Sequence, residues 1–307
     1  MEKRSERNYP MNKLAGIITP IVTPFSDEAG QPLCFQALEK HIEHLIDHGV
    51  AGIFVLGSNG EFHVLRHDEK ISLIAKAAEI IHGRVPLFAG TGSCSTQESI
   101  DLSVEAEKAG ADVLSILPPY FFQPSEEELF QHYTRIAERV SLPIILYNIP
   151  KTVGYTLSPT LVTRLAEHPS IVGIKDSSGK LELIDAYAEI ANSHDFSLLI
   201  GSDSKISYAH AKGAVGAIAG TSNLITDILV SLWKALEEKD ARKAAHLQEE
   251  IDVLRAVMKR GTVPSILKRS IERANIAPVG PARFPVQKPS LKVEEEIDQM
   301  LRHYHLL

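Results

Sequence analysis

One lysine, Lys175, ends an apolar stretch of the kind that forms a buried strand, residues 171–175. The chain then becomes polar from Asp176 to Gly179. An amine at such a place can form an ion pair, or it can lose its proton and attack a carbonyl carbon to form a Schiff base. The polar residues that end other apolar stretches favour the second role.

Three other apolar stretches end in residues that suit a partner of this lysine. The run Gly57-Ser58-Asn59-Gly60 sets two small polar residues between glycines, and such a turn can point backbone N–H groups at a carboxylate or phosphate. Tyr147 ends a second stretch, where a phenol can move protons. A polar turn at residues 220–223 follows a third. The alternatives are an ordinary strand-to-helix turn for the first and a packed ring with a satisfied hydroxyl for Tyr147.

Together these residues predict one mechanism. The glycine-bracketed turn holds the carboxylate of a 2-oxo acid, the amine attacks its ketone, and the phenol moves protons. The mechanism requires no metal and no organic cofactor, because the protonated imine is itself the electron sink. This is the chemistry of a class I aldolase.

The elements that must position these residues follow a repeating pattern of strand and helix. Strands are predicted at residues 16–21, 52–56, 86–90, 112–117, 143–147, 171–175, 197–200 and 217–220. Each is almost continuously apolar, as expected for parallel strands that are covered on both faces. Helices are predicted between them at residues 33–48, 96–109, 126–140, 158–167, 181–192 and 205–212.

Eight such pairs predict an α/β fold, a (β/α)8 TIM barrel. An open doubly wound sheet is the competing fold, and the first strand lacks the GxGxxG that would favour it. In a barrel the carboxyl ends of all strands meet at one mouth, so the chemical residues would converge there.

Further helices at 227–236, 240–258, 262–275 and 291–304 predict a C-terminal helical appendage. We therefore expect a disordered extension at 1–12, the barrel at 13–225, and a helical region at 226–307 that packs on it.

Composition narrows the class of protein. The net charge is −7 and no dense basic tract occurs, which argues against nucleic acid or an anionic membrane as a partner. No apolar run approaches the roughly 20 residues that cross a bilayer. The charged start does not resemble a secretory signal, and two cysteines far apart imply no disulfide framework. A cytoplasmic protein is the simplest interpretation.

Two further features are predicted to be structural. His41, His44 and His48 recur at helical spacing, and we expect an exposed polar stripe rather than a metal site. Cys94 follows the third strand, and we expect a small buried filler rather than a reactive thiol.

The order of these motifs resembles a known family. The chain is similar to the dihydrodipicolinate synthase / N-acetylneuraminate lyase family of Schiff-base (β/α)8 enzymes, over nearly its whole length. The resemblance rests on residues 16–25, 57–61, 90–98, 110–112, 147–150, 173–176 and 201–203.

The resemblance implies a role for each candidate residue. Lys175 would form the imine with pyruvate, and Tyr147 would relay protons. Ser58 and Asn59, with the turn that begins at Gly57, would hold the pyruvate carboxylate, and Ile218 would pack against the pyruvyl group. The implied partners are pyruvate and a small aldehyde or 2-oxo acid, and the implied assembly is a homotetramer, a dimer of dimers.

Three departures from the family pattern bear on the reaction. Asn59 stands where the synthases have a threonine, Phe121 where they donate a tyrosine across a dimer interface, and Thr152 where an arginine binds aspartate semialdehyde. The run from Gly57 to Phe62 instead resembles 4-hydroxy-2-oxoglutarate aldolases. We therefore expect a Schiff-base pyruvate aldolase or lyase that acts on a 4-hydroxy-2-oxo acid or a 2-keto-3-deoxy acid. The alternatives are a 4-hydroxy-tetrahydrodipicolinate synthase and a non-catalytic barrel that only binds a 2-oxo acid.

Overall fold

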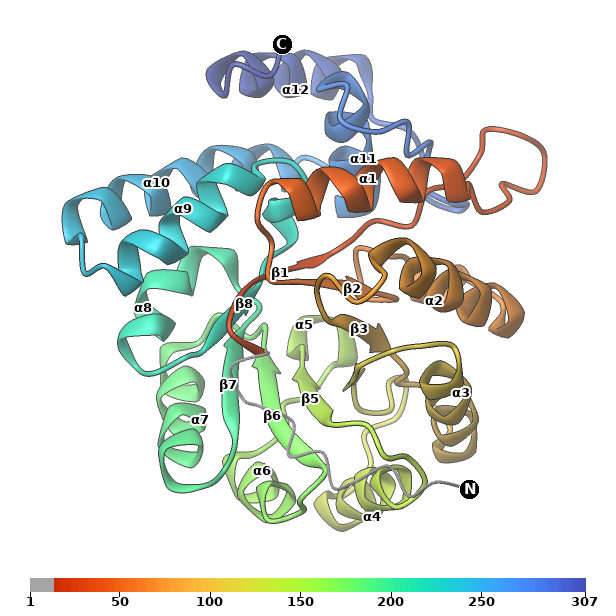
Figure 1. Cartoon of the computed structure of the whole chain (residues 1–307), viewed down its shortest axis with the longest axis vertical. Helices are drawn as coiled ribbons and strands as arrows, with labels where there is room; N and C mark the ends of the chain where they lie inside the picture. Colours follow the sequence, from red (N-terminus) through yellow and green to blue (C-terminus); the bar gives the residue numbers. More distant parts are fainter. Residues whose placement is uncertain (1–13) are drawn as a thin grey trace.

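Eight parallel strands close into a barrel in the computed structural model, which describes residues 14–307 (Figure 1). The strands are β1 (Gly16–Pro20), β2 (Gly52–Val55), β3 (Leu87–Gly90), β4 (Val113–Ile116), β5 (Ile144–Asn148), β6 (Ile171–Asp176), β7 (Ser197–Ile200) and β8 (Gly216–Ile218). Each pairs with its neighbour in the sequence, and β8 pairs with β1 to close the ring. The predicted (β/α)8 fold is confirmed. The prediction for residues 1–12 lies outside the described residues.

Side chains from alternate strand positions form a separate apolar cluster. It contains Leu14, Ile18, Phe54, Phe88, Val113, Ile145, Leu199 and Ile218. Seven of these come from seven different strands, and all eight are almost fully buried. Because successive strand residues point to opposite faces, this set fills the barrel interior, whereas the larger cluster joins the outer strand faces to the helices. The barrel interior is therefore a packed core and not a pore, which leaves the mouth as the place for a site.

Helices surround the barrel on the outside (Figure 1). They are α1 (Phe35–Asp47), α2 (His67–Ile81), α3 (Thr96–Lys108), α4 (Glu126–Ala137), α6 (Pro159–Ala166), α7 (Leu181–Ser193), α8 (Ile206–Ala211) and α9 (Thr226–Glu237). A single turn, α5 (Pro150–Val153), follows β5. Helix α2 was not predicted, although Leu73, Ile74, Ala77 and Ile81 give it a buried stripe.

Three more helices follow, α10 (Ala241–Met258), α11 (Val263–Arg273) and α12 (Leu291–His303). Helix α10 packs beside α9, and α12 lies farthest from the barrel (Figure 1). The C-terminal residues are thus helical, as predicted. Within residues 14–307, no helix is both long enough and apolar enough to cross a bilayer.

Two of the structural predictions were wrong. His41 is fully buried, and its Nε2 lies 3.1 Å from the Asn223 side-chain oxygen, so it is not part of an exposed stripe. Burial lowers the pKa of His41 to about 4, although the hydrogen bond to Asn223 acts in the opposite direction. Cys94 is exposed, and its thiol donates to the Tyr120 carbonyl rather than filling a core space.

Candidate active site

Lys175 and Tyr147 lie side by side at the barrel mouth. They occupy paired positions on β6 and β5, so the register of these strands sets them together. The Lys175 amine lies 3.8 Å from the centre of the Tyr147 ring and 4.9 Å from that of Phe54. Only 3% of Lys175 is exposed. The amine is thus held against two aromatic faces with little contact with bulk water.

Gly201, directly after β7, leaves room for this lysine. A Cβ built on Gly201 would lie 2.9 Å from Lys175 Cε and would collide with the Ser177 hydroxyl. Real Cβ atoms do not approach other carbons so closely. The absence of a side chain at Gly201 therefore lets the lysine stem extend across the end of β7.

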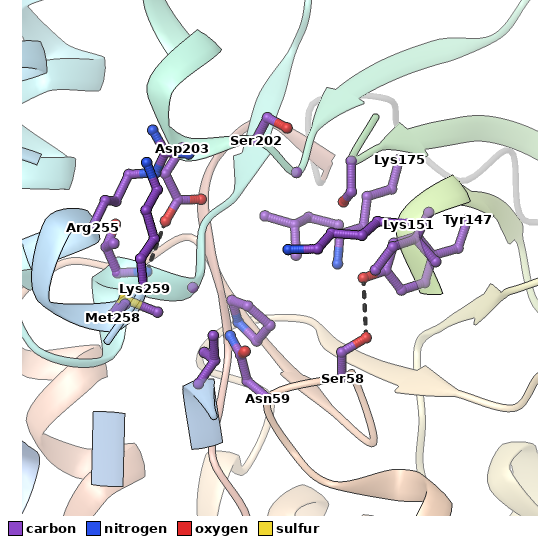
Figure 2. A pocket seen from close by; sticks show the side chains of 18 of the residues that line it. Ser58, Asn59, Tyr147, Lys151, Lys175, Ser202, Asp203, Arg255, Met258 and Lys259 are labelled. Atoms are coloured by element: carbon purple, nitrogen blue, oxygen red, sulfur yellow. Dashed lines mark hydrogen bonds between the residues drawn. The ribbon is translucent and has the colours of Figure 1, made fainter. Parts of the chain in front are cut away.

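Both residues line a cavity of about 440 Å³ at the carboxyl ends of the strands (Figure 2). Cavities of this order hold small molecules. Ser58, Asn59 and Ile218, each predicted from the sequence, lie in the same wall. The remaining lining residues are Pro20, Ile149, Lys151, Ser177, Gly201, Ser202, Asp203, Gly220, Thr221, Arg255, Met258, Lys259, Gly261 and Val263.

Gly57 does not line the cavity but starts the turn that does. Its carbonyl oxygen accepts the backbone N–H of Gly60 at 3.0 Å. This turn brings the Ser58 hydroxyl to 3.4 Å from the Tyr147 hydroxyl, as Figure 2 shows. Five of the six predicted site residues therefore line one cavity. Gly57 lies outside the cavity wall and starts the turn that carries Ser58 and Asn59.

Asn148 and Asp176 fix the strand ends next to Tyr147 and Lys175. The Asn148 amide donates to the Asp176 carboxylate at 2.7 Å, and its oxygen accepts the Leu157 N–H at 3.1 Å. The Ser178 hydroxyl donates to the other carboxylate oxygen at 2.7 Å. Burial raises the pKa of Asp176, although these hydrogen bonds oppose the shift. The result is a hydrogen-bonded bridge between the last residues of β5 and β6.

The surroundings of Tyr147 favour loss of its proton. Burial acts to raise the pKa of the phenol, but the positive charge of Lys175 and hydrogen bonds with Ser58, Lys175 and Ser177 outweigh it, and the pKa is lowered from its ordinary value. A phenol whose pKa is brought down can both give and take a proton more readily near neutral pH.

The Tyr147 pKa gives a direct prediction. In the wild-type protein one tyrosine will ionise below the ordinary value of about 10, because the Lys175 ammonium stabilises the phenolate. Ultraviolet absorbance of tyrosinate during an alkaline titration measures this. Tyr147→Phe will lack the early rise, and Lys175→Met will move it to higher pH, because only the hydrogen bonds with Ser58 and Ser177 then oppose the effect of burial. Superimposable titration curves for the wild type and Tyr147→Phe would contradict the assignment.

Comparison with known proteins gives the family. The model of the dihydrodipicolinate synthetase family matches residues 13–304. The chain belongs to this family. It is 36% identical over 286 residues to a 4-hydroxy-tetrahydrodipicolinate synthase of Methanoculleus marisnigri, covering 93% of this chain and 98% of that protein.

Two solved structures of family members that agree with the fold are complexes with pyruvate. YagE of Escherichia coli K12, a prophage protein of the family in complex with pyruvate, matches with a TM-score of 0.91 and 30% identity, over 95% of this chain and 99% of that one. A dihydrodipicolinate synthase of Acinetobacter baumannii complexed with pyruvate matches with a TM-score of 0.90 and 31% identity, over 96% of this chain and 100% of that one.

Membership of the dihydrodipicolinate synthetase family confirms three predictions. The resemblance stated from the motifs is correct, the barrel is the family fold, and the protein is an enzyme, a lyase of the class I aldolase kind. The alternative of a non-catalytic barrel is therefore set aside.

Sequence reasoning missed the part of the cavity that comes from the C-terminal region. Arg255 and Met258 lie in the last turn of α10 and Lys259 caps it, and all three line the cavity. Their spacing of three and four residues shows that they share a helix face. Nothing in the sequence indicates that this face covers the barrel mouth, because the last barrel residue in the cavity wall, Thr221, lies more than 30 residues before Arg255.

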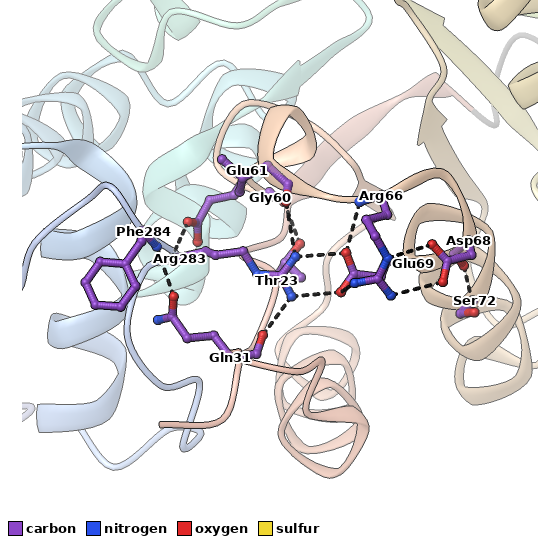
Figure 3. A network of polar contacts seen from close by, with 11 residues as sticks. Thr23, Gln31, Gly60, Glu61, Arg66, Asp68, Glu69, Ser72, Arg283 and Phe284 are labelled. Atoms are coloured by element: carbon purple, nitrogen blue, oxygen red, sulfur yellow. Dashed lines mark hydrogen bonds and ion pairs between the residues drawn. The ribbon is translucent and has the colours of Figure 1, made fainter. Parts of the chain in front are cut away.

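Glu61, just after the cavity-lining turn, joins the barrel to the C-terminal region (Figure 3). Its carboxylate accepts the backbone N–H of Arg283 at 2.9 Å and lies 2.7 Å from the Lys268 amine. The Arg283 guanidinium donates to both carboxylate oxygens of Glu69, at 2.9 and 2.8 Å. Lys268 and Arg283 each lie 4.2 Å from the centre of the Phe25 ring. This buried network fixes the turn that carries two of the cavity residues.

Proposed function

We propose that this protein cleaves a 4-hydroxy-2-oxo acid or a 2-keto-3-deoxy acid to pyruvate and an aldehyde, through a Schiff base on Lys175. The observation that carries the proposal is the pairing of Lys175 with Tyr147 in the wall of one cavity at the barrel mouth. Family membership supports it, because pyruvate is bound in two of the matching structures.

The proposed reaction proceeds in balanced steps. The Lys175 amine adds to the C2 ketone, and loss of water gives a protonated imine. The C3–C4 bond then breaks and its electron pair forms an enamine, while the 4-hydroxyl gives its proton to the Tyr147 phenolate and C4 becomes the aldehyde. The enamine takes a proton at C3, and water releases pyruvate and the free amine.

The remaining wall residues would hold the 2-oxo acid end. Ser58 and Asn59 present a hydroxyl, an amide and backbone N–H groups, which suit a carboxylate. Gly57 begins their turn. Ile218, which lines the same cavity, would be an apolar neighbour for the pyruvyl carbons. The lysine would thus meet a ketone whose acid group is already anchored, and such positioning lowers the barrier to attack.

The second candidate is a 4-hydroxy-tetrahydrodipicolinate synthase, which condenses pyruvate with aspartate semialdehyde. It is favoured by the names of the curated relatives. Against it stand Asn59, Phe121 and Thr152, which lack the hydroxyl and guanidinium groups that the resemblance assigns to synthases at these positions. The Schiff base is common to both candidates, so the second carbonyl compound decides between them.

The deciding experiment compares the two reactions on one preparation. We expect pyruvate release from 4-hydroxy-2-oxo acids or 2-keto-3-deoxy acids, measured with a coupled dehydrogenase, and little condensation of pyruvate with aspartate semialdehyde. A Thr152→Arg variant, which supplies the missing guanidinium, serves as the matched comparison and should gain condensation. Efficient condensation by the wild type without pyruvate release from any hydroxy acid would select the synthase.

We also propose a homotetramer, a dimer of dimers, with Phe121 in a subunit interface. Phe121 is 87% exposed with a backbone φ of 93°, a strained conformation for a bulky residue, and Phe122 beside it is 77% exposed. Two exposed rings at one loop tip suit burial by another subunit. Light scattering tests the assembly: a mass of one chain would contradict it, and Phe121→Asp should reduce a larger mass.

The division into a barrel at residues 13–225 and a helical region at 226–307 stays a prediction that limited proteolysis can test.

A cytoplasmic location is proposed as well, and is supported by two free cysteines, Cys34 and Cys94. Cell fractionation that finds the protein outside the cytoplasm would contradict it.

A further inference from the structure

Helix α10 closes one side of the cavity with a cationic face. Arg255 and Lys259 line the cavity together with Met258 between them. In Figure 2 these residues lie across the cavity from Lys175 and Tyr147. A substrate joined to Lys175 at one end would therefore extend toward them.

Hydrogen bonds hold α10 in this position. The Gln248 amide donates to the Asp203 carbonyl at 2.9 Å, and its oxygen accepts the backbone N–H of Ser207 at 3.0 Å. Both partners belong to the segment that follows β7. The cationic face is thus placed by contacts with the barrel and not by the substrate.

The positive charges of the side chains that line this end of the cavity are only partly compensated. Within residues 14–307, the Lys259 amine has no ion pair or hydrogen bond, and neither has the amine of Lys151, which lines the cavity after β5. Arg255 donates to Asp252 at 3.0 Å and keeps most of its five donors free. Among the lining residues Asp203 alone is acidic, and its carboxylate accepts the Thr221 N–H at 2.9 Å.

The helix dipole opposes this positive charge but is too small to cancel it. The carboxyl end of a helix carries roughly half a negative charge. Arg255 and Lys259 each carry a full positive charge, and Lys151 adds a third on another wall. Asp203 in the lining and Asp252 beside Arg255 each offset one of these charges. Three full positive charges against two carboxylates and half a charge from the dipole leave a small positive excess at this end of the cavity, which suits an anionic group.

We propose that Arg255 and Lys259, assisted by Lys151, bind a second anionic group of the substrate, at the end away from the ketone. The inference rests on the proposed function and specifies its substrate class: the aldehyde half carries a carboxylate or a phosphate, in addition to the acid of the pyruvate half. Arg255 and Lys259 are thus specificity-determining residues.

The experiment measures condensation of pyruvate with aldehydes that are matched in size and differ in charge. Glyoxylate is compared with glycolaldehyde, and glyceraldehyde 3-phosphate with glyceraldehyde, so that the two arms separate a carboxylate from a phosphate. We expect the anionic aldehyde of at least one pair to have a kcat/KM about 10-fold or more above its neutral counterpart, the scale of one lost charged hydrogen bond. Added salt should reduce this ratio.

Arg255→Met and Lys259→Met should each lower the ratio several-fold, about as expected for removing one charged partner. Lys243→Met, on the same helix but outside the cavity wall, is the matched control and should leave the ratio unchanged. Thermal melting verifies that each variant is folded.

An anionic-to-neutral ratio near one in the wild type, or a ratio that the two variants do not change, would overturn the inference. Failure of the proposed function is distinct, because it would give neither turnover of any aldehyde nor a borohydride-trapped pyruvate adduct.

Discussion

Lys175→Arg will lower kcat/KM for pyruvate release by at least about 10⁴-fold, within the range seen when a covalent nucleophile is removed. The reason is chemical: a guanidinium keeps its proton at every accessible pH and offers no lone pair for attack on a ketone. The arginine retains the positive charge and most of the stem, so the loss would report on nucleophilicity rather than on charge or packing.

Trapping locates the bond itself. Borohydride reduction in the presence of pyruvate should add the mass of a reduced pyruvyl group to the peptide that contains Lys175, and mass spectrometry of a digest detects it. Lys180→Arg, an exposed lysine at the start of α7, is the matched control and should keep the adduct. An adduct on another residue, or near-normal turnover by Lys175→Arg, would refute the Schiff-base mechanism for this chain.

Lys268→Met will lower the free energy of unfolding by about 3–5 kcal/mol, the usual cost of stranding a buried charge. Lys268 and Glu61 form a pair whose side chains are 1% and 2% exposed, 2.7 Å apart. Burial lowers the pKa of Lys268 to about 8, although the Glu61 carboxylate opposes the shift, so the amine keeps its proton at pH 7. Without it, Glu61 Oε1 has no other partner among residues 14–307.

A surface pair provides the comparison. Lys288 and Asp27 lie 3.1 Å apart with side chains 70% and 73% exposed, so Lys288→Met should cost less than about 1 kcal/mol. Urea unfolding measures both variants. The double variant Glu61→Leu/Lys268→Met should regain part of the loss, because it removes the stranded charge as well. Equal destabilisation by Lys268→Met and Lys288→Met would show that the buried pair does not join the two regions as described.

Exposure and neighbours were the features that sequence patterns predicted worst. His41 has the helical spacing of a polar stripe, yet it is buried against Asn223, which lies 182 residues later. Free cysteine is among the most buried residue types, yet Cys94 is exposed. Helical spacing shows which residues share a face, but what covers that face depends on segments distant in the chain.

The sequence by itself determined the barrel and the proximity of Lys175 and Tyr147. Apolar runs predict parallel strands that are covered on both faces, and eight of them close into a ring whose carboxyl ends share one mouth. Tyr147 and Lys175 each lie one residue before the end of two consecutive strands, β5 and β6, and the parallel register of these strands pairs them. A residue near a strand end has few possible neighbours, which is why the sequence predicted that these two side chains lie close together, whereas their catalytic roles stay a prediction.

Only the tertiary structure decided what surrounds that pair. It placed Arg255 and Lys259 over the cavity, joined Glu61 to Lys268, and made Gly201 the space into which Lys175 extends. Each of these contacts joins segments that no local rule connects, because the docking of α10 and α11 on the barrel depends on packing and hydrogen bonds summed over the whole molecule. The position of the lysine near a strand end was encoded locally, whereas the shape and charge of the cavity were set by the fold.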